Sequence, residues 1–187
     1  MLDRRQFLIV SGSAVLPRVP RRGGIVLYAP TNTLAEESWR GYRRCLDFDS
    51  PTRVVIVPAF QQLSREQWIA LRNEAGLVIL ESGLAFATES EMASHAAALQ
   101  THFGIRIAGR LRPSGLRYIR YRWPVEVLVR EFGAAVTVEG EGIANVSGQV
   151  VAARRGSVIY LGSPLGPLLL AGDPQAQAWI GAVTRIR

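Results

Sequence analysis

The chain has 187 residues, of which 48% are hydrophobic and 20% charged, and its formal net charge is +7. This composition predicts one folded globular domain and excludes wholesale disorder. No run reaches the roughly 18 uninterrupted apolar residues of a membrane-spanning helix, so no membrane span is expected. The cysteine Cys45 stands alone and the histidines are His95 and His102, which excludes an internal disulfide, a Cys-x-x-Cys site and a histidine-rich centre. We expect no metal and no cofactor.

The positive charge is concentrated at the start of the chain. All 22 basic residues are arginines, and the first 22 positions contribute +4 of the net charge because five arginines there accompany only Asp3. The remaining +3 is ordinary for a soluble domain. Nucleic acid is therefore not expected as the partner.

The sequence Asp3-Arg4-Arg5-Gln6-Phe7-Leu8 is the most specific short motif, and it resembles the twin-arginine export signal. The weakly apolar run Phe7–Leu16 has the length of a signal h-region. Against this, no Ala-x-Ala-like site follows, and Pro17–Arg22 is positively charged. The alternative is a basic N-terminus with a coincidental arginine pair. We expect residues 1–22 to be an export leader or such an N-terminus, and 23–187 to form a single domain. Export implies a periplasmic location, and the alternative a cytoplasmic one.

The first half of this domain alternates apolar runs with helix-start signals. The runs are Ile25–Ala29, Val54–Val57 and Leu77–Leu80, and the capping-box sequences are Thr33–Glu36, Ser64–Gln67 and Thr88–Glu91. Continuous β-branched runs are typical of strands buried on both faces. Three successive strand–helix units without hairpin turns predict a parallel sheet with helices on both faces.

The second half has a different pattern, which predicts an antiparallel extension of the same sheet. We expect extended segments at 105–111 and 116–121, a helical turn or short helix at 124–132, strands at 136–139, 149–153 and 157–161, and a closing helix at 175–183. Asp173-Pro174 supplies the N-cap and first position of that closing helix.

Several of these segments resemble a known family. Val54–Pro58, Leu63–Glu66 with its helix to Gly76, and Leu77–Gly83 give strand, proline, polar loop, helix, glycine, strand and small loop. This order resembles the class I glutamine amidotransferase-like fold, in particular ThuA-like proteins and the β-galactosidase trimerisation domain. The late segment Arg154–Pro164 fits as well, so the resemblance covers about residues 24–183. It implies an α/β, flavodoxin-like three-layer sandwich whose sheet is mainly parallel with an antiparallel C-terminal portion.

The resemblance also implies that the chain is not an amidotransferase. Catalytic members of the family place a cysteine at a strand-to-helix elbow and a histidine after a later strand. Here Glu81 stands at the nucleophile position, both histidines lie on the helix after the elbow, and Cys45 falls in the first helix. The catalytic triad is absent, so the chain is more readily a binding protein than an enzyme.

Polar side chains follow the predicted strands where a parallel sheet binds its ligands, outside the carboxyl ends. The candidate ligand-binding residues are Asn32, Phe60, Gln61, Glu81, Ser82 and Ser163. Amides, hydroxyls and an aromatic ring suit a sugar or polyol. Alternatively, these side chains cap helices and solvate loops. Because strand 77–80 is uniformly apolar, Glu81 is expected to be desolvated and to bind backbone N–H groups at the following helix or an arginine.

A small hydrolase that uses Ser82 or Glu81 in the same crevice is the alternative function. The elbow lacks the glycine two positions before Ser82 that a nucleophile turn requires. His95 follows about three helical turns later, which predicts a separation of roughly 15–20 Å. We therefore expect a non-catalytic exported binding or assembly module that engages a carbohydrate or a partner protein. A second copy of the chain, giving a homo-oligomer, is one such partner.

Arginines and aromatic residues are interleaved between positions 106 and 122. The arginines are Arg106, Arg110, Arg112, Arg117, Arg120 and Arg122. One interpretation is an anionic partner, whether a polyanionic glycan, lipid headgroups or single-stranded nucleic acid. The alternate spacing instead favours the solvent face of strands, with Leu111 and Tyr121 pointing inward. We favour this second interpretation, in which glutamates that follow pair with the arginines; these are Glu126, Glu131, Glu139 and Glu141.

Overall fold

The structure is a computed structural model, and it describes ten segments of the chain. These are residues 9–10, 24–28, 34–43, 53–58, 60, 63–73, 76–82, 88–111, 115–132 and 135–186. The arginine pair Arg4-Arg5, Asn32, Cys45, Gln61 and Arg112 lie outside the described residues.

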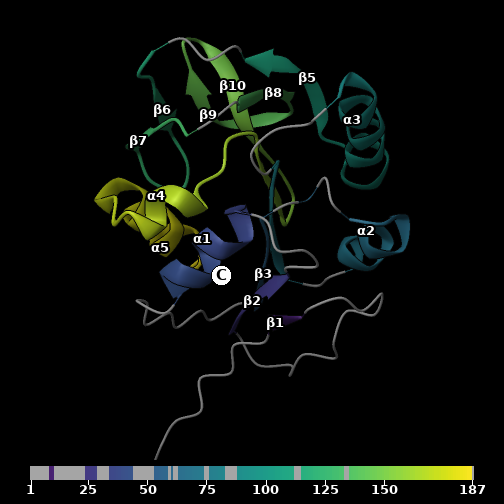
Figure 1. Ribbon diagram of the computed structural model, residues 1–187, viewed down its shortest axis with the longest axis horizontal. Helices are drawn as coiled ribbons and strands as arrows, with labels where there is room; N and C mark the ends of the chain where they lie inside the picture. Colours follow the sequence, from purple (N-terminus) through teal and green to yellow (C-terminus); the bar gives the residue numbers. More distant parts are fainter. Residues whose placement is uncertain are drawn as a thin grey trace, which may run out of the picture.

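Strands outnumber helices in the described chain (Figure 1). The strands are β1 (Ile9–Val10), β2 (Gly24–Tyr28), β3 (Arg53–Val57), β4 (Leu77–Glu81), β5 (Arg106–Leu111), β6 (Tyr118–Tyr121), β7 (Val127–Arg130), β8 (Ala135–Glu139), β9 (Glu141–Val146), β10 (Gln149–Arg155) and β11 (Val158–Leu161). The helices are α1 (Leu34–Arg43), α2 (Arg65–Arg72), α3 (Glu89–Phe103), α4 (Gly166–Leu170) and α5 (Pro174–Val183).

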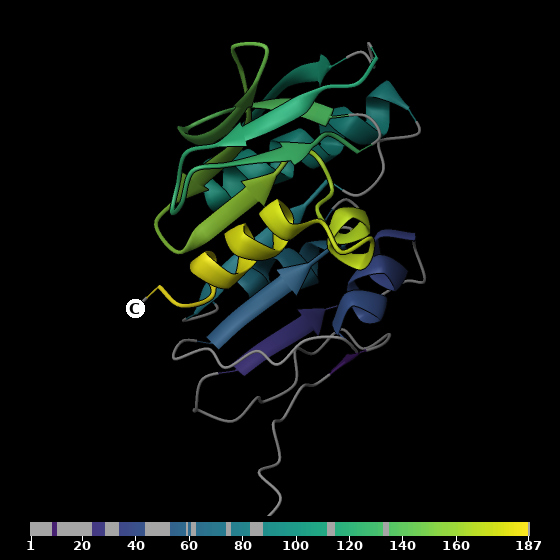
Figure 2. The ribbon, with the colours of Figure 1, turned by 90° about the vertical axis from the view of Figure 1, so that its left-hand side faces the viewer.

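Most strands belong to one mixed sheet of nine, in the order β1-β2-β3-β4-β11-β10-β9-β6-β7. The pairs from β1 to β11 are parallel, and the pairs from β11 to β7 are antiparallel. A second, two-stranded sheet is formed by β5 and β8, which are antiparallel. Figure 2 shows the strand-rich part above and helices α4 and α5 in front of the strands below it.

The expected flavodoxin-like three-layer sandwich is wrong, and with it the glutamine amidotransferase-like frame. Half of the strand pairs in the large sheet are antiparallel. The small sheet covers part of the large sheet, at a place where a layered α/β sandwich would have a helix. Val136 and Val138 of β8 pack with Ala153 of β10 and Tyr160 of β11 in one buried cluster. Local sequence patterns could not reveal this layer, because β5 and β8 pair across an intervening hairpin.

The predicted strands of the first half are present, and their side chains explain their burial. Residues 54–57 of β3 are at most 2% exposed. Val54 and Ile56 belong to one buried cluster, and Val55 and Val57 belong to another. Because successive side chains of a strand point to opposite faces, this division shows that hydrophobic layers cover both faces of the sheet.

Three helix starts follow from their capping residues. Ser64 forms a full capping box with Gln67, Thr88 accepts from the backbone N–H of Glu91, and Asp173 accepts from the first turn of α5. The helical turn expected at 124–132 is wrong, because its core is β7. There Val127 and Val129 are buried while the residues beside them are exposed, which is the period of a strand.

Candidate functional site

Glu81 is the last residue of β4, and no part of it is exposed to solvent. Its Oε2 accepts a hydrogen bond of 2.9 Å from the indole Nε1 of Trp39. Its Oε1 accepts one of 2.9 Å from the backbone N–H of Leu165. Burial raises the pKa of Glu81 to about 7, and the hydrogen bonds from Trp39, Leu165 and the Gly166 backbone lower it by less. Both carboxylate oxygens therefore accept hydrogen bonds at a position that solvent does not reach.

The neighbouring elements meet at Glu81 because of the sheet order. β4 lies between β3 and β11, so its carboxyl end is central, and the chain after β11 returns across it into α4. Gly166 permits this approach, since a Cβ there would lie 2.6 Å from Cδ1 of Trp39. The expected backbone N–H partners are present, but they come from the helix after β11 rather than the helix after β4. Among the described residues, no arginine forms an ion pair with Glu81.

Ser82 follows directly and is 1% exposed, and its hydroxyl makes no hydrogen bond of normal geometry with the described residues. It lies beside Tyr160, whose pKa burial raises and the Ser82 hydroxyl lowers by less. The Tyr160 hydroxyl is also 3.5 Å from Nε2 of His95. The large separation expected for His95 is therefore wrong: α3 brings its imidazole back to the tyrosine that adjoins Ser82.

His95 is part of a buried aromatic cluster, and burial lowers its pKa to about 3. Phe60 is wholly buried and packs edge-on against His95, with ring centroids 4.6 Å apart. The ring centroids of Phe103 and Tyr160 lie 5.7 and 6.3 Å from that of Phe60. The structure thus places Phe60 in the core, where it offers no flat surface to a ligand.

Ser163 is also buried, at 4% exposure, and donates a hydrogen bond of 3.3 Å to the backbone carbonyl of Phe132. Of the six candidate binding residues, the structure describes four, and all four are less than 5% exposed. It brings Glu81 and Ser82 together at the end of β4. Neither presents its functional atoms to solvent.

The arginine-rich stretch pairs largely with glutamates, as the alternate spacing predicts. Arg106 bonds to Glu139, and Arg120 to Glu126, at exposed positions. Arg117 bonds to Glu131 with two contacts of 2.5 and 2.7 Å, and these side chains are only 13% and 5% exposed. Tyr121 points into the core as expected, at 2% exposure.

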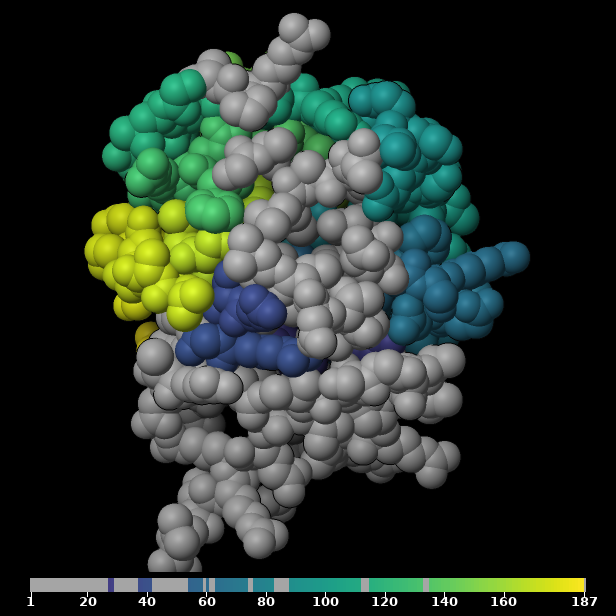
Figure 3. Space-filling model, viewed as in Figure 1, coloured from purple at the N-terminus to yellow at the C-terminus, as the bar shows by residue number. Residues whose placement is uncertain are grey.

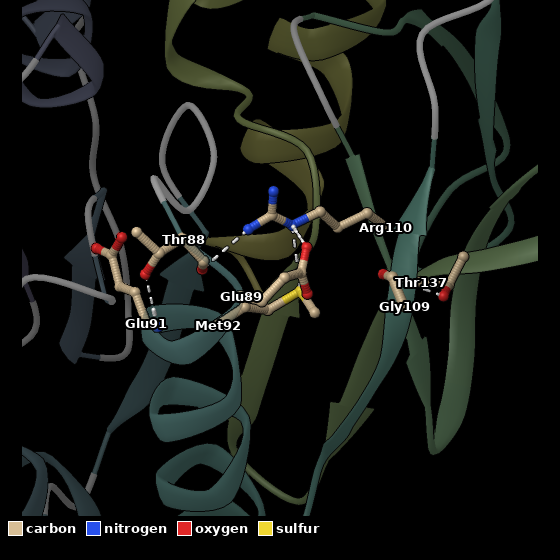
Figure 4. Close-up of polar contacts among 7 residues, drawn as sticks. All are labelled: Thr88, Glu89, Glu91, Met92, Gly109, Arg110 and Thr137. Atoms are coloured by element: carbon tan, nitrogen blue, oxygen red, sulfur yellow. Dashed lines mark hydrogen bonds and ion pairs between the residues drawn. The ribbon is translucent and has the colours of Figure 1, made fainter.

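Arg110 has a different structural role, shown in Figure 4. Its guanidinium reaches from β5 to the start of α3, where it donates a hydrogen bond of 3.1 Å to the backbone carbonyl of Thr88. The same group lies 3.4 Å from the Met92 sulfur and 3.6 Å from Glu89. This arginine therefore ties the small sheet to the first turn of the helix beside it.

Sequence analysis did not identify Trp39, Tyr160 or the Leu165–Gly166 backbone as neighbours of the strand end. In the sequence, Trp39 is one of several residues that recur at helical intervals, and a backbone N–H carries no sequence signal. Within the described segments, no group of three or more His, Cys, Asp or Glu side chains is placed to hold a metal ion. The helices described are also too short or too polar to cross a membrane.

Comparisons with known proteins give a fold likeness. No family model matches the chain, and no curated protein matches its sequence. The exo-β-1,4-mannosidase Op5Man5 from Opitutaceae bacterium strain TAV5 is similar in structure over 98% of this chain and 37% of its own, with a TM-score of 0.50 and 13% identity. A β-galactosidase from the psychrophilic Marinomonas ef1 matches over 70% of this chain and 21% of its own, with a TM-score of 0.46 and 15% identity. The chain thus spans well under half the length of either enzyme and shares a fold with part of the mannosidase.

Proposed function

We propose that this chain is a non-catalytic module that binds carbohydrate or attaches to a carbohydrate-active protein. The observation that carries the proposal is the closed carboxylate of Glu81, which is wholly buried and hydrogen-bonded at both oxygens. Most glycoside hydrolases need two carboxyl groups facing one sugar bond, about 5–10 Å apart. No charge of a second carboxylate is among the causes that shift the pKa of Glu81 in the described part of the chain. The site suits the stabilisation of a strand terminus better than chemistry on a substrate.

The carbohydrate part of the proposal is supported by the fold likeness to the mannosidase. The similar region is 37% of that enzyme's chain, which is the size of an accompanying domain. A module of this kind contributes by adding affinity for a polymer or by fixing a partner, because linking a binding domain raises the effective concentration of whatever it accompanies.

The test combines binding and activity on the full chain. Manno- and galacto-oligosaccharides should raise the melting temperature, because a ligand that binds only the folded state stabilises it. Chromogenic mannosides and galactosides should show no hydrolysis above the buffer blank. Glu81→Gln should retain the binding. Hydrolysis that this substitution abolishes would contradict the proposal, and an unchanged melting temperature across the whole panel would contradict carbohydrate binding and leave attachment to a partner protein as the role.

A hydrolase remains the second candidate, since the Ser82 hydroxyl adjoins a tyrosine that contacts a histidine. Ser82 is 1% exposed, so a substrate would have to open the strand end. Ser82→Ala discriminates the two functions with a panel of short-chain esters. Ester hydrolysis that disappears in Ser82→Ala would favour the hydrolase, whereas equal background rates would favour the non-catalytic module.

We further propose export by the twin-arginine route, on the motif Asp3–Leu8. Replacement of Arg4 and Arg5 by lysine should retain a fused reporter in the cytoplasm, because the route reads the arginine pair. Unchanged secretion of the reporter by this variant would oppose the proposal. The matched control replaces Arg21 and Arg22 by lysine and should leave export intact.

A further inference from the structure

Exposed apolar side chains gather on the β6–β7 hairpin. Among the described residues, six large hydrophobic side chains are exposed, and four of them belong to this hairpin and its flanks. They are Leu116 at 62%, Tyr118 at 53%, Leu128 at 55% and Val125 at 37% exposure. Such a concentration marks an interaction surface rather than the scatter of single apolar residues that any soluble protein shows.

The strand register places two of these side chains, Tyr118 and Leu128, on one face. Tyr118 of β6 stands opposite Arg130 of β7, and Arg120 stands opposite Leu128. All four are exposed, while the intervening residues of both strands are buried against the core. Figure 2 shows the hairpin in front of the upper part of the molecule, and in Figure 3 its atoms form part of the upper left surface. We define the hairpin face as Leu116, Tyr118, Arg120, Arg122, Leu128 and Arg130.

The hairpin face carries a surplus of positive charge. Arg120 is neutralised by Glu126 from the turn. Arg122 and Arg130 are exposed, and no hydrogen bond or ion pair joins their side chains to the described residues. Arg130 stands beside Tyr118, and Arg122 directly follows the end of β6, four residues after Tyr118. The two charges are therefore about 13 Å apart along the strand direction.

We propose that the hairpin face docks the protein on the surface of an anionic lipid bilayer. Leucine and tyrosine side chains enter the boundary between headgroups and acyl chains, and arginines bind the lipid phosphates. The two kinds of side chain alternate on the paired strands, where Tyr118 stands opposite Arg130 and Leu128 stands opposite Arg120. This alternation matches a bilayer surface, where phosphates and hydrocarbon lie within a few ångströms of every contact point. The proposal does not rest on carbohydrate binding.

Most other occupants fit the hairpin face less well. A protein partner would use tyrosine and arginine as well, and it would be indicated by a wild type that does not partition into vesicles. A second copy of the chain would set two positive faces against each other. A nucleic acid would need many phosphate contacts and several stacking rings, but the face offers one ring and two free guanidiniums. An anionic glycan would leave both leucines without a role.

The experiment measures the partition of the full chain into vesicles of phosphatidylcholine alone and of an equimolar mixture with phosphatidylglycerol. The variants are Arg122→Gln with Arg130→Gln, and separately Leu128→Ser. Matched controls on the exposed side of α2 are Arg72→Gln and Ile69→Ser, the latter 43% exposed in the native protein. The basic residues of positions 1–22 are present in every variant, so differences between variants report the hairpin face.

The wild type should partition into the mixed vesicles and much less into phosphatidylcholine. Each arginine removed should lower the partition coefficient about fivefold, and Leu128→Ser should lower it several-fold, while both controls match the wild type. Equal binding by Leu128→Ser and wild type would overturn the proposal. Binding to soluble heparin that needs both arginines but not Leu128 would also overturn it, in favour of an anionic glycan. Melting temperatures equal to that of the wild type establish that each variant is folded.

Discussion

The indole N–H of Trp39 donates to the carboxylate of Glu81 across 42 positions of sequence, and this bond joins α1 to the end of β4. The same carboxylate accepts from the backbone at the start of α4. One buried acid thus fixes three separate elements around the carboxyl end of a central strand. Both oxygens of the Glu81 side chain therefore have hydrogen-bond donors within the protein.

Removal of the indole N–H should destabilise the protein. Trp39→Phe keeps an aromatic ring but leaves Oε2 of Glu81 without that donor, so the free energy of unfolding should fall by about 1–3 kcal/mol. Trp68→Phe is the matched control, because the indole N–H of Trp68 is buried with no acceptor among the described residues. Urea denaturation of the two variants tests this, and an equal loss in both would show that the ring and not the hydrogen bond matters.

Glu81 should make the protein less stable as the pH rises from about 4.5 to 7. Its pKa is about 7 in the folded protein and near 4.5 in the unfolded chain. Between these values the folded state holds a proton that the unfolded state has lost, so stability falls by about 1.4 kcal/mol per pH unit and by about 3 kcal/mol in total. Glu81→Gln resembles the protonated acid and removes this loss.

Urea denaturation of wild type and Glu81→Gln at pH 5 and pH 8 measures the difference. The variant should gain on the wild type by about 3 kcal/mol between these two pH values. Tyr121 is the titratable group that faces Glu81, and burial raises its pKa, with the charge of Glu81 adding to this, so it stays neutral throughout. A gap between the two proteins that stays constant with pH would refute the prediction.

His95 should act in the opposite direction. Burial lowers its pKa to about 3, whereas the unfolded histidine titrates near 6.5. As the pH falls from 6.5 to 4.5, His95 is protonated in the unfolded state but not in the folded state. Its contribution to the free energy of unfolding therefore drops by about 3 kcal/mol. His95→Phe should lose this drop. Denaturation of the variant and the wild type at pH 6.5 and 4.5 would show it, because the Glu81 effect is common to both proteins. A change in stability between the two pH values that is equal in variant and wild type would contradict the prediction.

Local structure could be predicted from the sequence where one residue or one short pattern decides it. Ser64, Thr88 and Asp173 cap their helices because each offers a side-chain oxygen to a free backbone N–H. The β-branched run of β3 could be identified as a doubly buried strand. These features depend on neighbours in sequence, so no knowledge of the fold was needed.

The pairing of the second half could not be obtained in that way. β9 was not expected, although the turn at Ser147 and Gly148, with φ of 49° and 80°, joins it to β10. The layer made by β5 and β8 depends on contacts between distant segments. At the candidate site, Glu81 could be identified from its place after an apolar strand, but its partners Trp39 and Leu165 come from elements that only the sheet order brings together.

The two glutamate–arginine pairs of the β6–β7 region should differ in energy, although they share the same chemistry. Arg117 and Glu131 are 13% and 5% exposed, whereas Arg120 and Glu126 are more than half exposed. Arg117→Gln leaves a nearly buried carboxylate without its cation, which costs about 3–5 kcal/mol. Arg120→Gln breaks a pair that water already reaches, so it should cost less than about 1 kcal/mol. Urea denaturation at neutral pH in low and high salt compares them, and the small loss in Arg120→Gln should shrink further in salt because water and ions reach that pair. If both variants lost the same amount of stability, burial would not be the factor that separates the two pairs.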